Sequence, residues 1–122
     1  MNESELRATI AAEAAASKLA HDIVILEVGD IIGITEYFVV CSANNTRQVR
    51  TVVDEIDEQV RVLTDGRARA TEGLDTASWV LLDYGDVIVH VFLAETREFY
   101  GLERLWADAP RRTLDPTAVS ER

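Results

Sequence analysis

The chain of 122 residues has little cysteine, few basic residues and no long apolar runs. Its single cysteine, Cys41, excludes a disulfide within the chain and suits a reducing compartment. No apolar stretch approaches the roughly 20 residues of a membrane span. The acidic, alanine-rich N-terminus also lacks the basic segment that opens a signal peptide. These absences predict a cytoplasmic protein that does not associate with membranes.

Basic residues are outnumbered by acidic ones. The chain has 12 lysines and arginines against 22 aspartates and glutamates, which gives a net charge of −10. A field of this sign repels the phosphate backbone of nucleic acids and anionic lipid. We therefore expect no direct binding of nucleic acid, whereas a basic protein partner would be attracted. The same charge also fits a protein that uses it only for solubility.

Sequence motifs of common enzymes and metal sites are missing as well. The chain contains no Gly-x-Gly-x-x-Gly, P-loop, Cys-x-x-Cys or His-Glu-x-x-His pattern, and Ser42 lacks the glycines of a nucleophile elbow. Cys41 lies in an apolar run, where a thiol is expected to be inert. No catalytic residue, metal ligand or cofactor is therefore predicted. One alternative stays open: Asp83, Asp86 and Glu72 could hold Mg²⁺, although carboxylates beside a tight turn are also ordinary turn formers.

The spacing of apolar residues predicts a single α/β (α+β) domain, because a chain of this length can bury a core without disulfides or metals. The expected elements are a helix over 4–20, strands over 22–28 and 37–42, a helix over 44–63, a short strand over 67–71, a hairpin over 79–92 and a helix from Thr96. The order α-β-β-α-(β)-β-β-α implies a mixed sheet with packed helices. The domain is expected to span residues 1–109, with a disordered tail over 110–122.

The most informative segment is residues 79–106, WVLLDYGDVIVHVFLAETREFYGLERLW. We expect a two-residue loop at Tyr84-Gly85, with Asp83 opposite Asp86 and Trp79 opposite His90. Alternation along the strands then gives a purely aliphatic face, which consists of Val80, Leu82, Val87, Val89 and Val91. The opposite face consists of Trp79, Leu81, Asp83, Asp86, Ile88, His90 and Phe92.

This second face mixes aromatic, apolar and hydrogen-bonding groups. Such a mixture is typical of a protein-binding surface, and equally of a second core layer under a helix. In the helix that follows, the expected buried stripe consists of Phe99, Leu102, Leu105 and Trp106. Four arginines could bind an anion: Arg47, Arg50, Arg97 and Arg104. More commonly such residues lie over a helix face and pair with a nearby acid, such as Glu103 or Glu95.

Four segments resemble the ribosomal silencing factor family, also called the Iojap-like family. They are DIVILEV at 22–28, ITEYFVVCSANNTRQVRTVVDEI at 34–56, Glu72-Gly73 and residues 79–106. The resemblance implies a small mixed α/β domain, similar to a nucleotidyltransferase core without its catalytic equipment. It also implies a non-enzymatic translation repressor that forms a homodimer when free. Members of the family bind protein number fourteen of the large ribosomal subunit and block joining with the small subunit when nutrients are short.

The resemblance places the partner-binding site on the mixed face and the tip of the hairpin. The site predicted in this way consists of Trp79, Asp83, Tyr84, Asp86, Ile88, His90 and Phe92. An acidic protein suits the role, since ribosomal proteins are usually basic. Gly101 departs from the pattern, because a glycine inside a helix costs roughly 1 kcal/mol relative to alanine.

Two hypotheses that assign the protein to other functional classes stay open at this point. One is a minimal metal-dependent enzyme similar to a nucleotidyltransferase, which would use Asp83, Asp86 and Glu72 around Mg²⁺ and would bind ATP. The other is a dimeric adaptor with no ribosomal role, which would not sediment with ribosomes.

Overall fold

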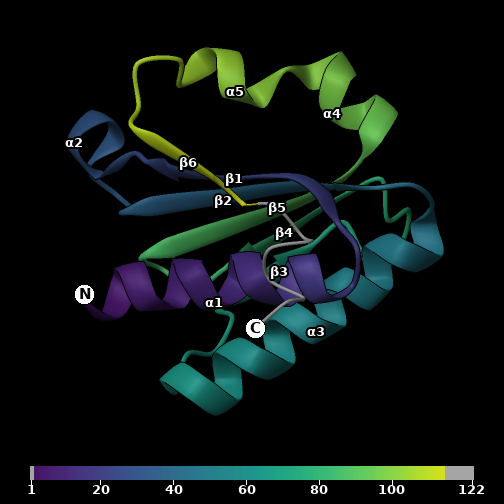
Figure 1. The fold of residues 1–122 in the computed structure, drawn as a ribbon, viewed down its shortest axis with the longest axis horizontal. Helices are drawn as coiled ribbons and strands as arrows, with labels where there is room; N and C mark the ends of the chain where they lie inside the picture. The colour runs from purple at the N-terminus through teal and green to yellow at the C-terminus, as the bar shows by residue number, and fades with distance from the viewer. Residues whose placement is uncertain (1, 115–122) are drawn as a thin grey trace.

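A six-stranded sheet lies between two helical layers of unequal size (Figure 1). The structure is a computed structural model and describes residues 2–114. Its elements are α1 (Glu3–Ser17), β1 (His21–Glu27), α2 (Gly29–Ile32), β2 (Tyr37–Ala43), α3 (Thr46–Thr64), β3 (Ala70–Glu72), β4 (Trp79–Asp83), β5 (Val87–Leu93), α4 (Ala94–Tyr100), α5 (Leu102–Leu105) and β6 (Arg111–Leu114). This order confirms the predicted mixed α/β domain. Within residues 2–114, no helix is long and apolar enough to cross a membrane.

The strands lie in the order β3-β4-β5-β2-β1-β6. β2 and β5 run parallel, and the other neighbouring strands run antiparallel. All seven residues of β2 are buried, as expected for a continuously apolar segment at the centre of a sheet. The parallel pair joins the hairpin β4–β5 to the strands from the first third of the chain, so both parts share one core.

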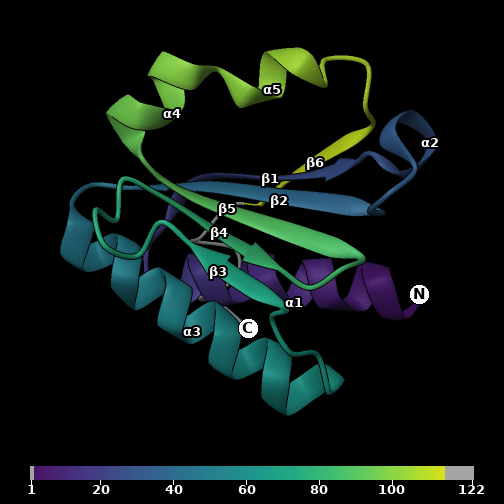
Figure 2. The ribbon, with the colours of Figure 1, turned by 180° about the vertical axis from the view of Figure 1, so that it is seen from behind.

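Helices α1 and α3 cover one face of the sheet, here called the inner face (Figure 2). Asn45 caps α3 by accepting a 2.8 Å hydrogen bond from the Gln48 amide. The buried stripe of α3 follows the predicted helical spacing and includes Val49, Val52, Val53, Ile56 and Val60. Helix α1 packs mainly through alanines and is capped by Asn2.

Helices α4 and α5 cross the opposite face, here called the outer face, and lead to β6 at the edge of the sheet (Figure 1). Gly101 separates them with a φ of 58°, a left-handed conformation that glycine adopts without strain. The prediction of one continuous helix from Thr96 is therefore wrong, because α4 begins at Ala94 and ends at Tyr100. This short layer leaves Trp79 and Leu81 on the outer face partly exposed.

The chain remains ordered beyond the predicted end of the domain at residue 109. β6 pairs antiparallel with β1, with Arg112 opposite Ile25. The structure thus corrects the predicted disordered tail at residues 111–114, because main-chain pairing with the edge of β1 holds a strand whose side chains are mostly exposed. The rest of that tail, residues 115–122, lies outside the described residues.

Candidate functional site

The hairpin β4–β5 has a different register from the one expected. Asp83 lies opposite Ile88, and Trp79 lies opposite Phe92. The loop is Gly85-Asp86, one residue later than predicted, since the Tyr84 amide donates to the Val87 carbonyl at 2.9 Å. Gly85 has a φ of 89°, and the first loop position of a type II′ turn favours glycine for this reason. The strand pairing shifts by two residues, which leaves each strand residue on its predicted face.

The aliphatic side of the hairpin consists of the predicted residues, and it packs against α1 and α3. Its members Val80, Leu82, Val87, Val89 and Val91 all belong to the inner core. Tyr84 continues this phase, because it follows Leu82 by two residues. Its ring is buried on the inner face, and its hydroxyl donates to Asp57 Oδ1 at 3.0 Å. Tyr84 was predicted to lie in the loop at the hairpin tip and to bind the partner together with Trp79; its ring is instead buried on the side of the sheet opposite to Trp79.

The two aspartates of the hairpin tip face different partners. Asp83 Oδ1 accepts from the Gly85 amide at 2.8 Å. Asp86 Oδ2 accepts from Ser4 Oγ at 2.6 Å and from the Arg7 guanidinium, which anchors the loop to α1. Asp86 therefore also leaves the predicted partner face. Within residues 2–114, no three histidine, cysteine or acidic side chains gather in a way that could hold a metal ion.

Trp79 lies half-buried on the outer face between aromatic neighbours. Its ring stacks on Phe92 with centroids 4.8 Å apart and contacts Tyr100 at 5.0 Å. Its indole Nε1 donates to His90 Nδ1 at 3.1 Å. Because Nδ1 accepts this bond, the proton of the neutral imidazole is on Nε2. The Trp79 ring is thus fixed in orientation before any partner binds.

His90 and Phe92 lie beneath the surface that they were predicted to form. Phe92 has no exposed surface and His90 is 4% exposed, so neither can contact a partner in this conformation. Burial lowers the pKa of His90 to about 4, and the ring is therefore neutral near pH 7. Both residues support Trp79 from below. For Trp79, Asp83 and Ile88, which are partly exposed, contact with a partner stays a prediction.

Two exposed aromatic residues of α4 extend this surface, and the sequence pattern had assigned one of them to the core. Phe99 is 81% exposed and Tyr100 is 56% exposed, and their rings meet edge to face at 5.0 Å. Leu105 is likewise exposed, whereas Leu102 and Trp106 pack on the outer face as predicted. The helical period fails because Gly101 breaks the helix. That glycine was the signal in the sequence for the break.

We call the resulting outer-face patch the aromatic surface; it consists of Trp79, Leu81, Ile88, Phe99 and Tyr100. Gly73 lies against the backbone at the start of β4. An added Cβ at Gly73 would lie 2.1 Å from the Trp79 carbonyl oxygen, so this position requires glycine. Apolar and aromatic side chains exposed together, beside the Asp83 carboxylate, are the composition expected of a protein-binding surface.

The sequence and the fold can be compared with those of known proteins. A family model described as "ribosomal silencing factor during starvation" matches residues 1–122. The chain belongs to the ribosomal silencing factor family. The ribosomal silencing factor of Bacillus subtilis is 43% identical over 107 residues, which cover 87% of this chain and 89% of that protein.

A more distant relative of this chain is a mitochondrial protein. The mouse "mitochondrial assembly of ribosomal large subunit protein 1" is 34% identical over 90 residues, which cover 71% of this chain and 39% of that protein. A crystal structure of a protein from Chromobacterium violaceum has a TM-score of 0.83 at 27% identity and covers 88% of both chains. The resemblance drawn from the four sequence segments is thereby confirmed for the family and for its fold.

Proposed function

We propose that this silencing factor represses translation by binding protein number fourteen of the large ribosomal subunit and blocking its joining with the small subunit when nutrients are scarce. The effect is steric and requires no catalysis. The proposal is supported by the family and by the mouse relative, whose name refers to the large subunit. The single observation that supports the binding site is the partly exposed, pre-oriented ring of Trp79 in the aromatic surface.

Charge complementarity supports a basic protein as the partner. The chain has a net charge of −10, and such a field speeds the approach of a positively charged surface while it repels the RNA backbone around it. Aromatic side chains then supply the short-range contact, since tryptophan and tyrosine dominate the energetics of protein interfaces. We also propose that the free protein is a homodimer, which analytical ultracentrifugation can test.

A non-catalytic mechanism is consistent with the side chains that could otherwise react. Burial raises the pKa of the Cys41 thiol to about 12, so the thiolate is not formed near pH 7. Asp86 is held by Arg7, and the buried His90 ring is neutral. These groups are engaged in structure and give no pair of acid and base at one exposed point.

Co-sedimentation with isolated large and small ribosomal subunits tests the proposal. The wild-type protein should sediment with the large subunit alone, and Trp79→Ala should lose at least tenfold in affinity. Trp79 is half-buried, so its truncation should cost less than the roughly 3–5 kcal/mol of a fully buried aromatic, and the variant should stay folded.

Leu63→Ala is the matched control, because Leu63 is 56% exposed on α3, away from the aromatic surface. It should bind like the wild type. Binding of Trp79→Ala at wild-type affinity would show that the site lies elsewhere. Failure of the folded wild-type protein to bind either subunit would exclude the ribosomal role.

A further inference from the structure

Helix α4 has the reverse of the usual amphipathic pattern. A surface helix normally packs through an apolar stripe and exposes its charges. In α4 the buried residue is Arg97, which is 8% exposed, while the adjacent Phe99 and Tyr100 face solvent. The helix therefore buries little apolar surface and exposes two aromatic rings. A polar side chain holds it on the sheet.

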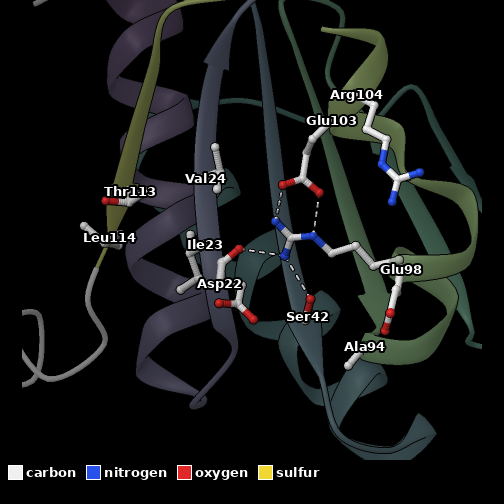
Figure 3. Close-up of a pocket in the computed structure, with 12 residues that line it drawn as sticks. Asp22, Ile23, Val24, Ser42, Ala94, Glu98, Glu103, Arg104, Thr113 and Leu114 are labelled. Atoms are coloured by element: carbon white, nitrogen blue, oxygen red, sulfur yellow. Dashed lines mark hydrogen bonds and ion pairs between the residues drawn. The ribbon is translucent and has the colours of Figure 1, made fainter. Parts of the chain in front are cut away.

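That side chain is Arg97, whose guanidinium lines a pocket of about 800 Å³ between α4–α5 and the sheet. Asp22, Ser42 and Glu103 line the same pocket (Figure 3). Nε and Nη2 donate to the two carboxylate oxygens of Glu103, each at 2.8 Å. Nη1 donates to the Asp22 carbonyl at 2.6 Å and to Ser42 Oγ at 2.8 Å. The pairing with Glu103 was one of the two arrangements left open from the sequence, and the structure contains it.

One side chain thus joins α4 to three other elements, because Glu103 belongs to α5, Asp22 to β1 and Ser42 to β2. The planar guanidinium can serve a carboxylate and two further acceptors at once, which a single ammonium cannot do with the same geometry. The bond from Arg97 also lowers the pKa of Glu103, which keeps the carboxylate charged. A helix of seven residues has little stability of its own, so its position depends on these bonds.

We propose that Arg97 is a positioning residue for partner binding: through Glu103 it clamps residues 94–105 onto the sheet and so holds Tyr100 against Trp79. The proposal rests on the proposed function, in which the aromatic surface meets the ribosome. Arg97 itself is buried and does not contact the partner. Its role is to complete a surface whose two parts come from the hairpin β4–β5 and from α4.

The test follows Trp79 as a fluorescent reporter in a Trp106→Phe background. The chain has two tryptophans, so this background leaves Trp79 alone. Trp106 Nε1 is buried without a hydrogen-bond partner among the described residues, and phenylalanine therefore removes no bond there. Arg97→Lys keeps the positive charge but loses the planar guanidinium that bonds both carboxylate oxygens of Glu103. We expect Trp79 to become at least twice as accessible to acrylamide quenching, and affinity for isolated large subunits to fall at least tenfold.

Arg104→Lys is the matched control, since Arg104 is an exposed neighbour of the same type on α5. It should change neither quenching nor affinity. Glu103→Gln removes the charge of the acceptor with little change in shape, and it should shift both readouts in the same direction by a smaller factor. The double variant should add little to Arg97→Lys, because both changes break one interaction.

The readouts separate the possible outcomes. If Arg97→Lys and Glu103→Gln show the same Trp79 quenching as the wild type, the proposal that Arg97 clamps residues 94–105 is wrong. The same holds if their binding is weaker while the quenching is unchanged. If Arg97→Lys does not fold, as shown by thermal unfolding, Glu103→Gln decides in the same way. If the unmodified protein binds no subunit, the proposed function fails, while Trp79 quenching still decides whether Arg97 positions α4.

Discussion

The inner and outer faces of the sheet differ in chemistry and in how completely helices cover them. The inner face is aliphatic along β4 and β5, and α1 and α3 bury it. The outer face is aromatic, and α4 and α5 bury only part of it. The inner helices pack mainly through apolar residues, although Arg7 of α1 is also buried, whereas the buried residue of α4 is Arg97. One face therefore stabilises the domain through burial, whereas the other leaves aromatic side chains exposed to solvent.

The largest expected effect comes from two adjacent leucines of β4. Leu82 is 1% exposed on the inner face, so Leu82→Ala should lower the free energy of unfolding by about 2–5 kcal/mol. Leu81 is partly exposed on the outer face, and Leu81→Ala should cost less than about 1 kcal/mol. Affinity for the large subunit should show the opposite ranking. Urea unfolding and co-sedimentation measure the two effects, and equal loss of stability would remove the distinction between the faces.

A change of pH should alter the free energy of unfolding through His90, which lies on the outer face. His90 has a pKa of about 4 in the folded protein, against about 6.5 in an unfolded chain. Between these values the unfolded state binds more protons, so the free energy of unfolding falls as the pH is lowered. Between pH 7 and pH 5 the expected loss through this group is about 2 kcal/mol.

Urea unfolding at both pH values, with two variants, checks this origin. His90→Gln should lose most of the dependence in this range. His21→Gln should keep it, because His21 lies on the surface against Asp22 and Asn44. A His90→Gln protein that responds to pH like the wild type would assign the effect to other groups.

The smallest change in stability is expected at Phe99. Its side chain is 81% exposed, so Phe99→Ser should alter the free energy of unfolding by no more than about 0.5 kcal/mol. Affinity for the large subunit should nevertheless fall about fivefold, as expected for an aromatic contact worth roughly 1 kcal/mol. Val62→Ser on α3 is the control, because Val62 is 63% exposed and lies outside the aromatic surface. If both variants bind the large subunit equally well, the partner-binding surface consists of residues of the sheet and does not include α4.

Period-2 alternation was enough to predict the two faces of the hairpin, because a pairing error of two residues leaves the phase of each strand intact. It could not predict the loop, and the shift of that loop moved Tyr84 and Asp86 to the inner side. The sequence also predicted the aromatic character of the outer face, but it did not predict how deeply each of these side chains is buried. Phe92 and His90 share a strand phase with Ile88, and only the covering helices decide which of them solvent can reach.

The helical part of the site was harder to predict. A periodic stripe assumes one continuous helix, and Gly101 ends that helix after Tyr100. The bond from Arg97 to the Asp22 carbonyl joins residues 75 positions apart. Local spacing contains no information on such a contact. The sequence therefore suggested only that arginines such as Arg97 pair with Glu103 or Glu95, and it left the choice of acid, the burial of Arg97 and its further partners unknown.

The contacts of Asp86 have a consequence for how the newly made chain folds. This residue bonds to Ser4 and Arg7, which lie 82 and 79 positions earlier. Synthesis of that length takes roughly 4–16 s at about 5–20 residues per second. The first helix therefore leaves the exit tunnel long before its final anchor exists, and contacts of such long range slow folding. Assembly of the domain should be completed late, after the hairpin β4–β5 has emerged from the ribosome.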